Sequence, residues 1–205
     1  MRGFLLIDMN KIFYFFAAAL FLTACSSNTK KIIVFSHDHP TIDKDGKSFS
    51  CKDTLGHNEQ TVVYEDATAL DIKISSKAGD GTISIPTNGY YIANLKHNDT
   101  IIGSYQSYSA PGEESKLITQ VELKAKIDSL HLLMEGKNVS AANRNFFITP
   151  NTCAKITDNT DAVIVLPYNQ LPAIETQNGK MPEIYKFYTA KELREIIANL
   201  EGLTK

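Results

Sequence analysis

The chain has 205 residues, of which 43% are hydrophobic and 21% charged, so it is long enough and apolar enough to bury a core. Lys and Arg total 21 against 23 Asp and Glu, which gives a formal net charge of −2 at pH 7. This balance offers no basic face, and we therefore expect no nucleic-acid partner.

The N-terminal segment has the three parts of a secretory signal. Lys11 supplies a positive charge, residues 12–21 are all apolar, and small residues come just before Cys25. The apolar run is too short to span a bilayer, whose hydrocarbon core takes about 20 apolar residues. The sequence Leu22-Thr23-Ala24-Cys25 resembles the lipobox of bacterial lipoproteins, in which an aliphatic residue and two small residues precede a cysteine.

The lipobox resemblance implies that residues 1–24 are a signal peptide, that the Cys25 sulfur receives diacylglycerol and that the new N-terminus is acylated. The implied partner is a lipid bilayer, because two or more acyl chains hold a protein stably at a membrane. Ser26 directly after the cysteine implies an outer-membrane location under the familiar sorting rule. Some lineages export lipoproteins to the cell surface with acidic residues after the cysteine; Lys30 and Lys31 follow here instead, which favours a protein facing the periplasm. Residues 25–30 would then be a tether.

Two alternatives stay open for this segment: an uncleaved membrane helix, and an ordinary secreted protein with a chance cysteine. The start of the chain also has two candidates, Met1 and Met9. Asp8 adds an acidic residue to a region that is basic in secretory signals, and a start at Met9 would leave it out.

The two remaining cysteines are Cys51 and Cys153. Export places them in an oxidising compartment, and an even number of cysteines there favours a disulfide between them. The alternative is a pair of separate buried thiols.

Short runs rich in β-branched and aromatic residues, separated by Gly, Pro, Asn and Asp, predict strands. Residues 37–60 contain Pro and Gly breaks and predict a long loop. Antiparallel hairpins are expected from the segments 70–75 with 82–85 and 90–95 with 100–105. The predicted strands are 31–36, 60–64, 70–75, 82–85, 90–95, 100–105, 146–149, 154–157 and 162–167.

Two helices are predicted, which gives an α+β fold with an antiparallel sheet, a meander of short strands, in a single domain over residues 31–205. The long helix covers residues 116–134 and ends at Gly136. It has two apolar stripes: Leu123, Ile127, Leu130 and Met134 form one, and Ile118, Val121, Ala125 and Leu132 form the other. We expect both stripes to be buried between layers, with a partner-binding stripe as the alternative.

The C-terminal helix covers residues 190–201. It begins at a capping box, in which Thr189 and Glu192 each satisfy a backbone amide of the other. Its apolar face predicts packing against the rest of the domain.

One cluster of residues has the chemistry of a metal site: His37, His39, Asp43 and His57. Histidines two apart at the end of a strand present both imidazoles on one face, and a third ligand from Asp43 or His57 would complete a zinc site with an open position. The alternative is a set of solvated loop residues. No other cofactor is predicted, and no catalytic residue is assigned.

Four tyrosines, Tyr90, Tyr91, Tyr105 and Tyr108, lie in or just after the second predicted hairpin. We expect them to be cross-strand packing partners, with a surface for stacking sugars or peptides as the alternative.

The prediction that these features favour is a membrane-anchored envelope lipoprotein with a non-catalytic binding or structural domain. One alternative is a periplasmic metal-dependent hydrolase that uses His37 and His39. Another is an immunity or inhibitor lipoprotein whose two-faced helix contacts an envelope protein partner. Location and fold class do not decide among them.

Overall fold

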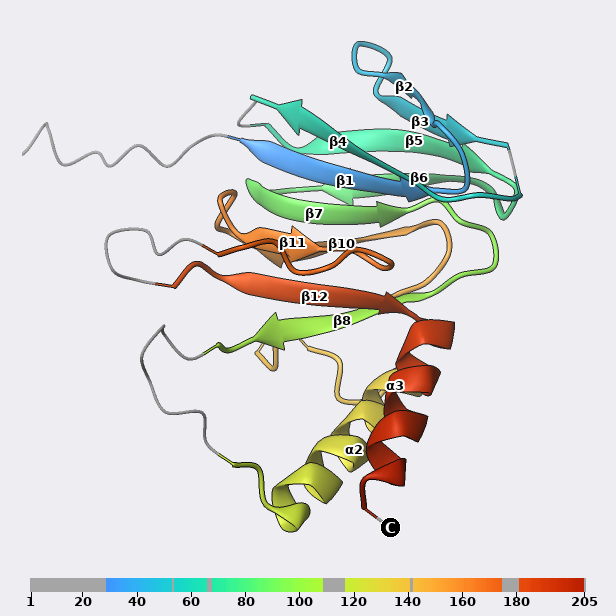
Figure 1. The fold of residues 1–205 in the computed structure, drawn as a ribbon. Coiled ribbons are helices and arrows are strands. Elements are labelled where there is room, and N and C mark those ends of the chain that lie inside the picture. Colours follow the sequence, from blue (N-terminus) through green and yellow to red (C-terminus); the bar gives the residue numbers. More distant parts are fainter. Residues whose placement is uncertain are drawn as a thin grey trace, which may run out of the picture.

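The protein is described by a computed structural model that covers residues 29–52, 54–65, 68–108, 117–140, 142–174 and 181–204. The predicted signal peptide and Cys25 lie outside these residues. Within them, no helix is long and apolar enough to cross a membrane. Figure 1 shows four layers from top to bottom: an upper sheet, a central sheet, a lower sheet and a pair of helices.

The central sheet has the strand order β10-β7-β1-β4. Its strands are β1 (Lys30–Ser36), β4 (Asn58–Tyr64), β7 (Gly89–Asn94) and β10 (Thr152–Thr157). β1 is parallel to β7 and antiparallel to β4, and β7 is antiparallel to β10. Every residue of β7 is buried, and so is all of β1 except Lys31. Such continuous burial is typical of a strand covered on both faces.

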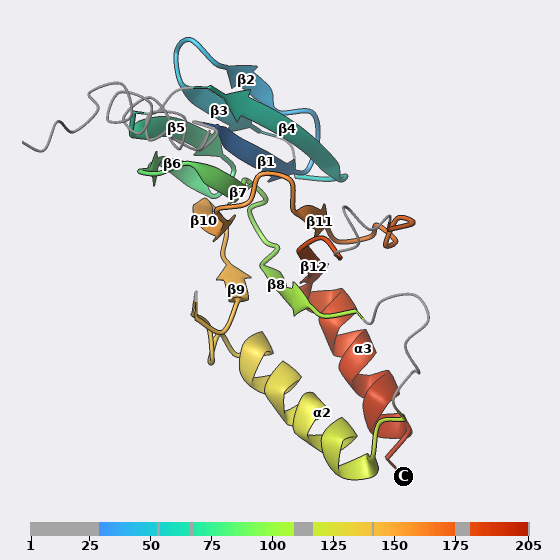
Figure 2. The same cartoon turned by 90° about the vertical axis from the view of Figure 1, so that its left-hand side faces the viewer.

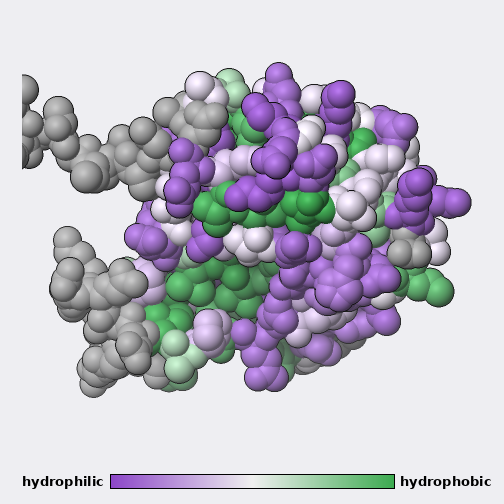
Figure 3. All heavy atoms as spheres, turned by 90° about the horizontal axis from the view of Figure 1, so that it is seen from above, coloured by the Kyte–Doolittle hydropathy of each residue, from purple (hydrophilic) through white to green (hydrophobic). Residues whose placement is uncertain are grey.

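The upper sheet packs on one face of the central sheet. Its order is β2-β3-β5-β6, built from β2 (Thr41–Asp43), β3 (Ser48–Cys51), β5 (Leu70–Ser76) and β6 (Gly79–Ile85). Leu70, Ile72 and Ile74 alternate with exposed residues and point into the shared core. The outer side of this sheet faces water, and Figure 3 shows hydrophilic residues over much of this end of the molecule, with apolar bands between them.

The lower sheet packs on the other face of the central sheet. Its order is β11-β12-β8-β9, from β8 (Ile101–Gln106), β9 (Asn145–Ile148), β11 (Val163–Val165) and β12 (Ile184–Thr189). Ile33, Phe35 and Ile92 of the central sheet meet Phe146, Tyr185 and Phe187 of the lower sheet in one core. Because alternate residues of a strand point to opposite faces, the far side of β8 and β12 is left for the helices.

The helices α2 (Gln120–Met134) and α3 (Ala190–Gly202) form the bottom layer. Ile127 and Leu133 of α2 pack with Leu193 and Ile197 of α3 and with Ile102 of β8. The two helices approach each other at the end far from the sheets and diverge toward them (Figure 2). His131 of α2 and Glu201 of α3 join the helices through a contact of 2.9 Å.

The helix boundaries agree closely with the sequence. The capping box of Thr189 and Glu192 is present at the start of α3, and Gly136, with a φ of +70°, follows the end of α2. α2 begins at Gln120 instead of 116 because Thr119 and Glu122 form a second capping box, which the sequence analysis missed.

The second apolar stripe of α2 is not buried, which corrects the expectation that both stripes lie between layers. Ile118 is 62% exposed, Val121 80% and Leu132 43%. Only the stripe containing Leu123, Ile127, Leu130 and Met134 packs against the core, because α3 and the lower sheet cover one side of α2.

The α+β class is confirmed, and most of the described strand pairs are antiparallel, but the strands form mixed sheets instead of one meander. The pairs β1/β7, β3/β5 and β11/β12 are parallel. The hairpin of 70–75 with 82–85 is present as β5/β6, whereas β7 and β8 belong to different sheets and do not form the second hairpin. The predicted loop at 37–60 contains β2 and β3, and β12 was missed. Tyr90 and Tyr91 are buried and Tyr105 contacts Tyr185 edge-on, as expected of packing residues, whereas Tyr108 is exposed.

Candidate functional site

The four predicted metal ligands contact four different partners. A ring nitrogen of His37 lies 3.0 Å from one of His97, and His39 Nδ1 lies 3.1 Å from Asn58 Nδ2. Asp43 accepts a bond from the amide of Gly46, and His57 Nε2 lies 2.9 Å from Glu59. In the described part of the chain, no group of three or more His, Cys, Asp or Glu side chains is placed to hold a metal ion. The zinc site that the sequence predicts at these four residues stays a prediction.

The structure instead gathers polar residues at the carboxyl ends of the parallel strands β1 and β7. His37 directly follows β1, and Lys96 and His97 follow β7. Because β4 is antiparallel to β1, His57 at its start lies at the same edge. Tyr168, after β11, contacts His57 edge-on with ring centroids 5.0 Å apart. We name these five residues the carboxyl-end cluster.

His37 and His97 are the closest pair in this cluster. The atoms in contact are His37 Nε2 and His97 Nδ1, and the ring centroids are 4.9 Å apart. Burial, followed by the charge of Lys96, lowers the pKa of His37 from its usual value of 6.5. A hydrogen bond between the His37 ring and the Gly56 backbone raises the pKa, which identifies the ring as the donor and a carbonyl as the acceptor.

Lys96 is a buried cation with aromatic neighbours. Its Nζ lies 4.7 Å from the ring centroid of Phe35 and 5.8 Å from that of Tyr168. The carboxylate of Asp99 is 3.5 Å away. A lysine that is only 2% exposed needs such compensation, because an isolated ammonium is costly to remove from water. The pair of Lys96 and Asp99 therefore leaves the cluster close to neutral.

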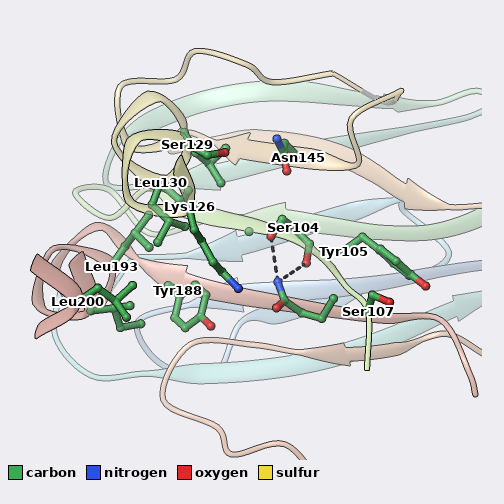
Figure 4. A pocket seen from close by; sticks show the side chains of 15 residues that line it. Ser104, Tyr105, Ser107, Lys126, Ser129, Leu130, Asn145, Tyr188, Leu193 and Leu200 are labelled. Carbon is green, nitrogen blue, oxygen red and sulfur yellow. Dashed lines mark hydrogen bonds between the residues drawn. The ribbon is translucent and has the colours of Figure 1, made fainter. Parts of the chain in front are cut away.

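A groove of about 500 Å³ lies between the lower sheet and the helices (Figure 4). This volume falls within the usual range of small-molecule sites. β8 and β12 form one wall, and α2 and α3 form the other. The lining residues are Ile102, Gly103, Ser104, Tyr105, Gln106, Ser107, Lys126, Ser129, Leu130, Leu133, Asn145, Tyr188, Leu193, Ile196 and Leu200.

The groove combines an apolar floor with a polar rim. Leu130, Leu133 and Leu193 come from the helix core. The Lys126 side chain extends from α2 toward Tyr188 and the end of β8 (Figure 4). Gln106 is held by donating to Ser104 Oγ at 3.0 Å. The described lining residues include Ser, Tyr, Gln, Asn and Lys side chains but no His, Cys, Asp or Glu.

Sequence reasoning placed His37 and His57 in a site but missed His97 and the whole groove. His97 lies 60 residues from His37, and only the parallel pairing of β1 with β7 brings them together. The groove residues come from β8, β9, β12, α2 and α3 and share no motif. No local sequence signal could have identified either arrangement.

Cys51 and Cys153 are free thiols in the structure. Both border the core between the upper and central sheets, and burial raises the pKa of Cys153 to about 12. The disulfide between them stays a prediction.

Comparison with protein-family models, curated proteins and solved structures finds no match to this chain. Function must therefore be argued from the site itself.

Proposed function

We propose that this protein is a lipid-anchored, non-catalytic binding domain of the bacterial cell envelope, and that the groove beneath the lower sheet takes its ligand. The observation that carries the proposal is a hollow of about 500 Å³ whose apolar floor is rimmed by hydroxyl, amide and ammonium groups. Pockets of this make-up fix an apolar body by burial and orient it through a few polar contacts. The ligand class is a small amphiphile with a polar or anionic end.

The proposed anchor rests on the sequence around Cys25. The proposed location is the outer membrane, with the domain facing the periplasm. Replacing Cys25 by serine removes the acylated sulfur, so we expect the chain to move from the membrane fraction to the soluble periplasmic fraction. Cell fractionation with immunoblotting measures this. Cys153→Ser is the matched control and should stay membrane-bound. A wild-type chain found in the soluble fraction, or a Cys25→Ser chain still held in the membrane, would contradict the anchor.

The groove is tested with 1-anilinonaphthalene-8-sulfonate, a fluorescent probe with an aromatic body and one negative charge. The Cys25→Ser chain, which carries no acyl chains, is titrated with the probe. Lys126→Glu reverses the charge that extends into the groove, and we expect the Kd to rise at least tenfold, or about 1.4 kcal/mol. Lys124→Glu makes the same charge change on α2 at a position that does not line the groove.

The control should shift the Kd by less than twofold. Equal weakening in the two variants would mean that the probe senses only overall charge. No change in either would place its binding elsewhere and reject the groove as the site.

Of the two alternatives, the inhibitor is supported by one observation: Val121 and Leu132 of α2 are exposed, and so is Ile118 just before the helix. Such a stripe is the kind of surface that contacts an envelope protein partner. The hydrolase has less support, because its two proposed residues, His37 and His39, contact different side chains.

A further inference from the structure

The spacing of His37 and His97 suits one metal ion. Zinc–imidazole bonds are about 2.0–2.1 Å long, so two nitrogens bound to one ion at 90–110° lie about 2.9–3.4 Å apart. His37 Nε2 and His97 Nδ1 are separated by 3.0 Å. This separation therefore lets the two nitrogens share one ion, provided that the rings turn so that both lone pairs face it.

Hydrogen bonds hold the backbone segments that carry His37 and His97. Leu95 N donates to Phe35 O at 2.8 Å and extends the β1/β7 pairing beyond the strand ends. Ser36 Oγ donates to Asp38 O at 2.7 Å, and Asn94 Nδ2 donates to Asp99 O at 2.7 Å. A ligand pair held by such contacts loses little conformational entropy when it binds an ion.

The segment between β7 and β8 carries two charged groups near the pair. Lys96 lowers and Asp99 raises the pKa of His37, and the two are 3.5 Å apart as an ion pair. The repulsion that Lys96 alone would exert on a dication is thus offset by Asp99.

From this geometry we propose that His37 and His97 form a site for one divalent transition-metal ion, of the copper and zinc class, at the carboxyl ends of β1 and β7, with water filling the remaining positions. Two imidazoles suit these ions, and Cu²⁺ binds more tightly than Zn²⁺ at a given nitrogen site. This site is separate from the groove and does not depend on it.

The test uses the full acylated chain in detergent, freed of metal, and titrated with CuCl2 and ZnCl2 by calorimetry at pH 7.5. We expect one ion per chain, with the Kd for Cu²⁺ at least tenfold below that for Zn²⁺. The Cu²⁺ EPR spectrum should show coupling to two nitrogens. His97→Gln, at a half-buried position, should raise the Kd for Cu²⁺ at least tenfold.

The matched controls are His39→Gln and His131→Gln, whose side chains contact Asn58 and Glu201 instead. Each control should leave the Kd within twofold of wild type. The EPR spectrum of the wild-type chain keeps the test independent of how well any variant folds. Coupling to no nitrogen, an unchanged Kd in His97→Gln, or an equal loss in His39→Gln would each overturn the proposal.

Discussion

Replacing Ile92 by alanine should lower the free energy of unfolding by about 2–5 kcal/mol. Ile92 lies on β7 in the central sheet and is fully buried. It packs in the core between the central and lower sheets, next to residues such as Ile33 and Phe187. Removing its three methyl or methylene groups loses the free energy of transferring them from water into the core. It also leaves a cavity, because the two packed sheets around Ile92 cannot move inward to fill it.

Urea unfolding followed by circular dichroism of the Cys25→Ser chain measures this loss. The matched control is Ile118→Ala, the same substitution at a position that is 62% exposed. The control should stay within about 0.5 kcal/mol of the parent. Similar losses in both variants would show that β7 is not enclosed on both faces, and the layered arrangement would be wrong.

The Gly103→Ala variant should be destabilised by about 1–3 kcal/mol, the usual cost of overpacking. Gly103 lies on β8 opposite Phe187 of β12. A Cβ there would lie 2.7 Å from the carbonyl oxygen of Lys186 and would also collide with the Phe187 ring. The carbonyl belongs to the paired backbone of β12, so it cannot rotate away as a flexible side chain would.

The control for this variant is Gly81→Ala on β6, where the added Cβ would meet Ile74 Cγ1 at an ordinary 3.6 Å. Both glycines are in strands, so the difference between the variants isolates the close approach. We expect Gly81→Ala to be near neutral or slightly stabilising, because alanine restricts the unfolded chain. An unfolding free energy for Gly103→Ala equal to that of the control would mean that β8 and β12 are farther apart than described.

Local patterns in the sequence determined much of the secondary structure. The alternation of Leu70, Ile72 and Ile74 predicted β5 and the face that it buries. The capping residues Thr189 and Glu192 predicted the start of α3 to the residue. Both features depend on neighbours within four positions along the chain, where side-chain period and backbone hydrogen bonds act directly. β2 and β3 were missed because they are short and lie among turn residues.

Only the tertiary structure decided which strands are neighbours and which sites result. The alternation of apolar residues along a strand indicates which face is buried but not which strand lies next to it. The sequence therefore could not show that β1 lies parallel to β7. That pairing brings His97 to His37 across 60 residues. The groove likewise exists only because β8, β12, α2 and α3 meet in space. By itself the sequence determined most of the elements and predicted the lipid anchor. Long-range packing determined the candidate sites, because contacts between distant segments leave no local pattern.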